Sequence, residues 1–131
     1  MGYAKFKELT KYFNVYKEVE LKELPNYTTE YITNNEKILG SYLNLVDYIL
    51  FTDKRFILFD KKPFRDNKTI HNIPYNSINS SAISFSKGKA KVLMSLDSGY
   101  QVRLDFIKMN HDKKERLKEL YKHVTTSYLE K

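Results

Sequence analysis

The stretch "DYILFTDKRFILFDKK", residues Asp47–Lys62, decides the fold. It holds two apolar runs rich in aromatic and β-branched residues, a composition that favours strands. Asp53 and Lys54 separate the runs, and we predict a tight hairpin there, because Asp tolerates positive φ and can bond its own local backbone. Lys54 or Arg55 is then expected to project outward, since strand side chains change faces at every residue.

The second run has no polar face, because Phe56 and Leu58 alternate with Ile57 and Phe59. A strand of this kind is covered on both sides. We expect the core to cover one side and either an N-terminal helix or a second copy of the chain to cover the other.

Toward the N-terminus, apolar residues recur at spacings of three and four, as in a short amphipathic helix with lysines on its other side. The apolar residues of this predicted helix are Phe6, Leu9, Phe13 and Tyr16. Leu24-Pro25 ends what precedes it, and a second short helix is predicted to open near Thr28. We expect residues 1–36 to be a helical extension packed on a core domain of residues 37–131. The first helix is the preferred cover, because its apolar residues need burial.

Seven short strands are predicted, each followed by turn residues. They are Ile38–Leu43, Tyr48–Thr52, Phe56–Asp60, Lys68–Ile73, Ile83–Ser86, Lys91–Leu96 and Gln101–Phe106. Ser86–Lys89 and Asp97–Gly99 predict two further hairpins. Three hairpins indicate an antiparallel meander.

After Asn110 the helical period returns. The apolar stripe of this predicted helix consists of Leu117, Leu120, Tyr121, Val124 and Tyr128. Asp112 followed by Glu115 resembles a capping box, so the helix is predicted to begin near Asp112. A small sheet that curls on itself leaves one end open, and this helix is expected to close it.

Two motifs together resemble the bacterial pleckstrin-homology-like domains. Asp47–Lys61 is similar to the hairpin of their second and third strands, and "IPYNSI", Ile73–Ile78, to the turn that follows. The likeness covers about Lys37–Glu130. It implies a barrel-like sandwich of two nearly orthogonal sheets capped by the C-terminal helix. It also implies a binding or assembly scaffold without catalytic residues, prone to homo-oligomerise.

The sequence departs in two ways from eukaryotic pleckstrin-homology domains. Members that bind phosphoinositides carry lysines and arginines around the first strand-to-strand loop, where this chain has Leu43–Asp47. Phosphoinositide recognition is therefore not expected. The tryptophan that often anchors the C-terminal helix is also missing, because the chain has none, and Tyr121 or Tyr128 is expected to fill its place.

The net charge of +7 and the pI near 9.4 favour anionic partners. Nine basic and two acidic residues lie between Lys54 and Lys91, so that segment holds the whole excess. The candidate binding residues are Lys54, Arg55, Lys61, Lys62, Phe64, Arg65, Lys68, Lys87, Lys89 and Lys91. Alternatively, these lysines only keep loop tips and sheet edges from aggregating.

Catalytic and metal-binding patterns are weak. The chain has no cysteine and three histidines, which leaves no thiolate and few nitrogen ligands, so we expect no metal and no cofactor. His71, with Asp66 upstream, is a poor candidate for a general base. The serines lack a G-x-S-x-G elbow, and Lys87-Gly88-Lys89 is too short for a phosphate loop. We expect no enzymatic activity.

The expected function is a non-enzymatic module that acts through protein or self association. Its electrostatic surface would combine the Lys61–Lys68 loop with the Lys87–Lys91 hairpin. Nucleic-acid binding is the main alternative, because exposed aromatic rings can stack on unpaired bases, although no RNP signature is present. Contact of Pro63-Phe64 and the flanking cations with an anionic membrane is the third. With neither a spanning segment nor a signal peptide in the sequence, a cytoplasmic location is expected.

Overall fold

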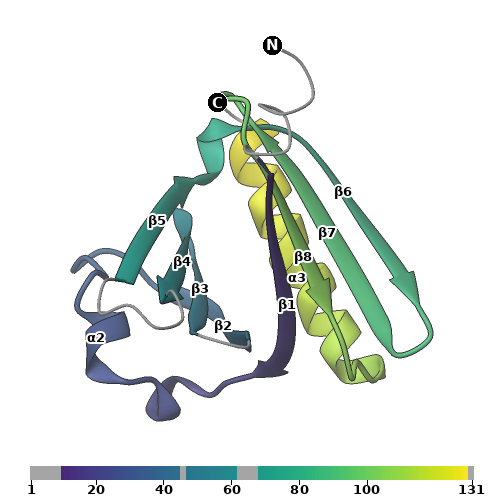
Figure 1. The fold of residues 1–131 in the computed structure, drawn as a ribbon, viewed down its shortest axis with the longest axis horizontal. Helices are drawn as coiled ribbons and strands as arrows, with labels where there is room; N and C mark the ends of the chain where they lie inside the picture. Colours follow the sequence, from purple (N-terminus) through teal and green to yellow (C-terminus); the bar gives the residue numbers. More distant parts are fainter. Residues whose placement is uncertain (1–9, 45–46, 62–67, 130–131) are drawn as a thin grey trace.

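The structure, a computed structural model, describes residues 10–44, 47–61 and 68–129. Its strands are β1 (Thr10–Glu18), β2 (Ile38–Asn44), β3 (Tyr48–Thr52), β4 (Arg55–Lys61), β5 (Lys68–Pro74), β6 (Ile78–Ser86), β7 (Lys89–Leu96) and β8 (Gln101–Phe106). Its helical elements are the 3-10 turns η1 (Leu21–Glu23) and η2 (Tyr75–Ser77) and the helices α2 (Asn26–Thr29) and α3 (His111–Leu129). All seven predicted strands are confirmed, and so is the short helix near Thr28 (Figure 1).

The strands form a single eight-stranded sheet in the order β5-β4-β3-β2-β1-β8-β7-β6. The sheet is open and does not close into a barrel, because β5 and β6 are edge strands on opposite ends of this order. β1 joins the two halves that the family resemblance implies as separate sheets. It pairs antiparallel with β2 and parallel with β8, whereas the other adjacent strands are antiparallel.

The helix predicted around Phe13 and Tyr16 is wrong where the structure describes it, because residues 10–18 form β1. Residues 1–9 of that prediction lie outside the described part of the chain. β1 provides hydrogen-bonding partners for β2 on one side and β8 on the other, and such backbone pairing outweighs a local periodicity. The spacing was only a partial guide, since residues four apart share a face in a strand as well as in a helix, whereas residues three apart share one only in a helix.

The apolar strand β4 is buried on both faces, as predicted. At most 1% of each of four consecutive side chains is exposed: Phe56, Ile57, Leu58 and Phe59. One face joins the main core. The other joins a second apolar cluster of Leu24, Leu50, Ile57 and Phe59 with the partly buried Val19, Tyr27, Ile32, Ile38, Tyr48 and Ile70. Within the described residues the cover is therefore the segment 19–38, which includes α2, while residues 10–18 of the predicted first helix form β1.

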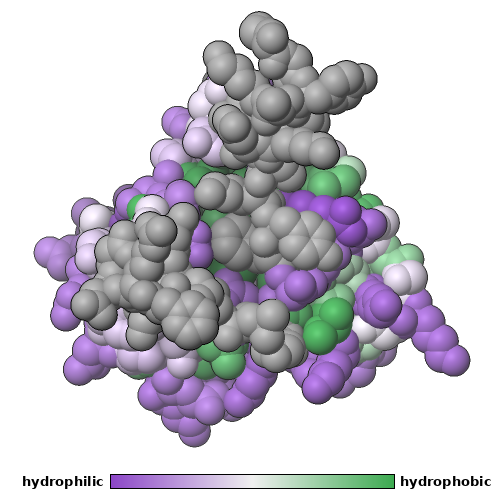
Figure 2. All heavy atoms as spheres, viewed as in Figure 1, coloured by the Kyte–Doolittle hydropathy of each residue, from purple (hydrophilic) through white to green (hydrophobic). Residues whose placement is uncertain are grey.

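Helix α3 packs on the main core and lies along the sheet (Figure 1). Leu117, Leu120 and Val124 are buried, as the apolar stripe predicted. The cap differs from the prediction: the N–H of Lys113 donates to Asn110 Oδ1 at 2.9 Å, so Asn110 caps the helix in place of Asp112. Asn fits this role because its side-chain oxygen accepts an otherwise unpaired amide of the first turn. On the face drawn in Figure 2, hydrophilic side chains predominate among the coloured atoms, with smaller hydrophobic patches between them.

Candidate functional site

The hairpin between β3 and β4 is organised by Thr52. Its hydroxyl oxygen accepts hydrogen bonds from the amides of Lys54 and Arg55, both at 3.1 Å. We predicted that the Asp53 side chain bonds its own local backbone. Its carboxylate instead accepts a hydrogen bond from the amide of Lys37 at 3.0 Å. The turn is thus tied to the segment that covers β4, because Lys37 immediately precedes β2.

Arg55 is held inside this arrangement. Its Nε and Nη2 donate to the carboxylate of Glu36 at 2.8 and 2.9 Å, and Nη1 donates to Asn72 Oδ1 at 2.7 Å. Only 1% of the Glu36 side chain and 21% of the Arg55 side chain are exposed. The Arg55 hydrogen bond is the main reason that the pKa of Glu36 falls to about 2. Lys54 or Arg55 was expected to project outward. Lys54 is exposed, whereas Arg55 is bound to the carboxylate of Glu36.

Lys54 and Lys87, two lysines of the candidate set, lie in two separate turns. Lys54 lies beside the C-terminal half of α3, where His123 Nε2 is 2.9 Å from the carbonyl oxygen of Asp53. The turn Lys87-Gly88 lies beside the start of α3, because the amide of Met109 donates to Gly88 at 2.9 Å. The structure therefore does not join the two turns into one basic patch.

The other candidates divide between the β6–β7 hairpin and the segment after β4. Lys87 and Lys89 are exposed and Lys91 is partly buried. Lys61 and Lys68 are opposite each other in the β4–β5 ladder. The remaining predicted residues, Lys62, Phe64 and Arg65, lie outside the described part of the chain.

The edge position of strand β6 is a feature that the sequence did not reveal. It is an edge strand, paired with β7 alone in the described sheet, and its nine residues include neither a charged residue nor a proline. The opposite edge, β5, begins with Lys68 and ends with Pro74. Lysine and proline are typical devices that prevent an edge from pairing with another chain. β6 has neither of them.

Helix α3 runs beside β6 and contacts it at three points. The Ser81 and Tyr121 hydroxyls are 2.8 Å apart, Lys114 Nζ donates to the Ser86 carbonyl at 2.7 Å, and the Lys118 ammonium lies 5.9 Å from the centre of the Phe85 ring. We call β6 together with Lys114, Lys118 and Tyr121 the β6 edge.

The two faces of β6 differ. Ser81, Ile83 and Phe85 lie opposite the buried Met94, Val92 and Ala90 of β7 and so face the core and α3. The alternate residues are small and exposed: Ser80, Ala82, Ser84 and Ser86. On that outer face Leu93 is opposite Ala82 and is 42% exposed, at the rim of a hollow of about 220 Å³.

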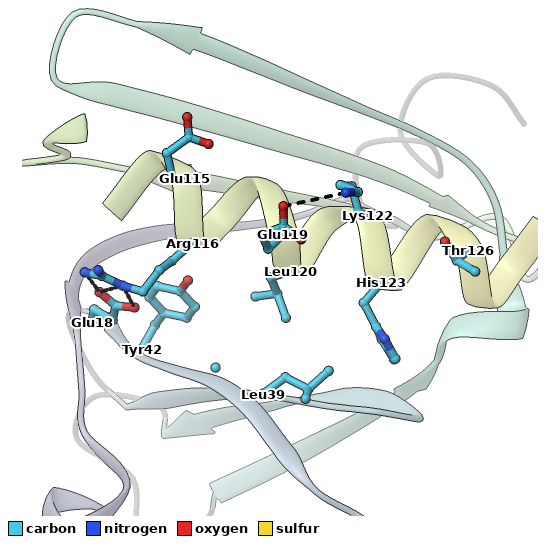
Figure 3. A pocket seen from close by; sticks show the side chains of 11 residues that line it. Glu18, Leu39, Tyr42, Glu115, Arg116, Glu119, Leu120, Lys122, His123 and Thr126 are labelled. Carbon is cyan, nitrogen blue, oxygen red and sulfur yellow. Dashed lines mark hydrogen bonds and ion pairs between the residues drawn. The ribbon is translucent and has the colours of Figure 1, made fainter. Parts of the chain in front are cut away.

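A larger groove of about 640 Å³ lies between α3 and the start of β2. Figure 3 shows Leu39 across this groove from Leu120 and His123. Its charged rim is internally paired: Arg116 Nη2 is 2.7 Å from Glu18 Oε1, and Lys122 Nζ is 3.6 Å from Glu119 Oε1. The groove therefore offers an apolar floor with largely neutralised charges and no orienting field for an ionic ligand.

The described residues offer little for catalysis. No group of three His, Asp or Glu side chains among them could hold a metal ion. His71 Nε2 is 3.8 Å from Asp60 Oδ2 on the neighbouring strand, and its predicted companion Asp66 lies outside the described residues. None of the helices in the described part of the chain is long and apolar enough to cross a membrane.

An open, mainly antiparallel sheet with a long C-terminal helix against it is typical of a pleckstrin-homology-like domain. The chain belongs to the bacterial PH domain family, whose family model matches residues 9–128. The resemblance seen in the sequence is confirmed. The match includes β1, which lies outside the stretch that carried the resemblance.

Several known proteins are similar to this chain. The uncharacterized protein YozO of Bacillus subtilis (strain 168) is 38% identical over 71 residues, which is 54% of this chain and 59% of that protein. The crystal structure of a protein with a pleckstrin-homology domain from Shewanella loihica has a TM-score of 0.65 and 23% identity, covering 88% of this chain and 97% of that one. A PH domain containing protein from Exiguobacterium sibiricum has a TM-score of 0.66 and 16% identity, covering 90% and 63%. At these identities the structures establish the fold alone.

Proposed function

We propose that this protein is a non-enzymatic module that binds a protein chain, another protein or a second copy, along the β6 edge. The observation that carries the proposal is the nine-residue edge strand without charge or proline. An edge strand presents a row of backbone donors and acceptors to any extended chain that approaches it. Proteins that use this property bind peptides by adding them as a further strand.

The lysines of the β6–β7 hairpin support this role. Lys87, Lys89 and Lys91 lie at the hairpin tip and along β7, next to strand β6. Charges at the rim of an interface raise association rates and select partners, while the backbone pairing supplies affinity. The Lys61–Lys68 loop is retained in the proposal as a second electrostatic surface, because it joins β4 and β5 at the other end of the strand order from β6.

The packing of the aromatic rings favours a protein partner over single-stranded nucleic acid. Base stacking needs exposed ring faces, and many rings of this chain pack on one another in the core. The Phe51 and Phe56 rings are stacked with their centres 5.4 Å apart, and the Tyr42 and Phe106 rings are 5.2 Å apart. All four side chains are at most 4% exposed.

Site-specific photo-crosslinking tests the proposal. A photoreactive phenylalanine analogue replaces Phe85, which is 39% exposed on the β6 edge, in the full chain expressed in bacterial cells. The matched control replaces Tyr31, an aromatic residue that is 44% exposed outside this edge and packs against Phe59. We expect protein adducts at position 85 and none at position 31, and mass spectrometry would separate a second copy from another protein. No adduct at position 85, or equal adducts at both positions, would overturn the proposal.

A further inference from the structure

The charge along the β6 edge is of one sign. Residues 78–96, which span β6 and β7, include three lysines and no aspartate or glutamate. Helix α3 adds Lys114 and Lys118 beside β6. A partner that pairs with this edge must therefore neutralise several positive charges.

The carboxylates nearest to these lysines compensate them only in part. Glu115 Oε2 is 3.4 Å from Lys118 Nζ, with both side chains about half exposed, and Glu115 also lies 3.9 Å from His111. Exposed pairs of this kind contribute little and exchange partners readily. Asp105 is opposite Lys91 in the β7–β8 ladder but also accepts hydrogen bonds from Arg103.

The spacing of the two helix lysines matches an extended chain. Lys114 and Lys118 are four residues apart, which corresponds to about 6 Å along a helix axis. Side chains on one face of a strand recur every second residue, or about 6.6 Å. The ammonium groups of Lys114 and Lys118 lie at the Ser86 carbonyl and the Phe85 ring, so carboxylates of a strand added beside this end of β6 would meet both cations.

The outer face of β6 favours apolar side chains in a bound strand. Ser80, Ala82 and Ser84 are small and leave room above the strand, and Leu93 is exposed beyond Ala82. Apolar side chains of an added strand would bury this leucine, and burial of apolar surface is favourable. The two faces together predict a partner sequence in which acidic and apolar residues alternate.

We propose that the β6 edge binds an extended acidic segment of another protein, with carboxylates at alternate positions toward Lys114 and Lys118 and apolar side chains toward Ala82 and Leu93. This inference rests on the proposed function and names its partner class. A second copy of the chain fits less well, because it would bring another uncompensated cationic hairpin to the same edge.

A labelled synthetic peptide in which aspartate alternates with valine is the probe, titrated with the full chain by fluorescence anisotropy. Charge reversal at both Lys114→Glu and Lys118→Glu should weaken its binding at least about tenfold. The matched control, Lys22→Glu with Lys37→Glu, changes the net charge equally at two exposed lysines away from β6 and should leave binding within about twofold. Circular dichroism would verify that both variants are folded. Equal weakening by the two variants would overturn the inference.

Backbone pairing is tested with two N-methylated forms of the peptide. Each form is methylated at alternate residues, so that one form loses the amides that face β6 and the other loses those that face solvent. We expect one form to lose binding and the other to retain it. Equal binding of both forms would mean attraction by charge alone and would also overturn the inference.

The outcomes separate this inference from the proposed function. Adducts at position 85 without peptide binding would refute the acidic segment and leave protein binding in place. Absence of both would refute both. Light scattering could give a mass above that of the monomer, and a lower mass for Ala82→Lys on β6 would then assign the edge to a second copy. Tighter binding of a single-stranded DNA probe, dependent on Lys114 and Lys118, would assign the edge to nucleic acid. Either result would overturn the inference.

Discussion

The guanidinium of Arg55 and the carboxylate of Glu36 form a two-point ion pair, with Nε 2.8 Å from Oε2 and Nη2 2.9 Å from Oε1. The carboxylate also accepts the Thr52 hydroxyl at 2.6 Å and the Thr33 amide at 3.1 Å. A residue that looked like part of a binding surface thus connects the segment covering β4 to the β3–β4 hairpin.

Replacing Arg55 by alanine should destabilise the protein strongly. Arg55→Ala leaves the Glu36 carboxylate, only 1% exposed, without its cation, and breaking a buried pair in this way costs about 3 kcal/mol. Urea unfolding measures the change in the free energy of unfolding. Lys54→Ala, at the exposed neighbour in the same turn, should change it by less than about 0.5 kcal/mol. Similar losses in both variants would contradict the structural role of Arg55.

The same pair predicts a loss of stability in acid. The pKa of Glu36 falls from 4.5 to about 2 in the folded chain, so below pH 4.5 the unfolded chain takes up a proton that the folded chain does not. Acid therefore favours unfolding: the contribution is fully present above about pH 5 and is lost as the pH falls toward 2. Between pH 6 and pH 3 the titration of Glu36 should lower the free energy of unfolding by about 2 kcal/mol.

Urea unfolding of the native chain and of Glu36→Gln, at both pH values, checks this expectation. The variant cannot titrate at this position, so the difference between the two proteins should shrink by about 2 kcal/mol at pH 3. A difference that stays constant between pH 6 and pH 3 would be inconsistent with a depressed Glu36 pKa.

The position of this hairpin could be predicted from the sequence, but the role of Arg55 could not. The two apolar runs and Asp53-Lys54 define the turn locally, by composition and turn preference. The partner of Arg55 lies nineteen residues earlier, and its approach depends on how the segment 19–38 folds over β4. Nothing in a local pattern distinguishes a cation that will be paired from one that will remain in solvent.

Strand β1 and the β6 edge were missed for a related reason. The apolar spacings of three and four around Phe13 favour a helix locally, and the pairing of β1 with both β2 and β8 outweighs that preference. The sequence predicted a strand at Ile83–Ser86, but an edge position is a property of the sheet order and has no signature in one strand. The turn residues Ser86–Lys89 did predict the β6–β7 hairpin.

The start of α3 gives a direct comparison between the sequence pattern and the structure. Asn110→Ala removes the side-chain acceptor for the Lys113 amide, and loss of an N-cap costs about 1 kcal/mol. Asp112→Asn keeps the shape of the side chain and removes only its interaction with the helix dipole, for about 0.5 kcal/mol or less. Thermal unfolding of the two variants ranks them. A larger loss of stability in Asp112→Asn would contradict the cap at Asn110 and support the capping box predicted from the sequence.

The cover of β4 can be tested at two leucines of the same segment. Leu24 is 9% exposed and belongs to the second apolar cluster with Leu50, Ile57 and Phe59, whereas Leu21 is 58% exposed. Leu24→Ala should lower the free energy of unfolding by about 2 kcal/mol, through lost burial and the cavity that remains. Leu21→Ala should change it by less than about 0.5 kcal/mol. If urea unfolding gave equal values, the segment 19–38 would not be the cover of β4, and the fully apolar strand would need a second chain on that face.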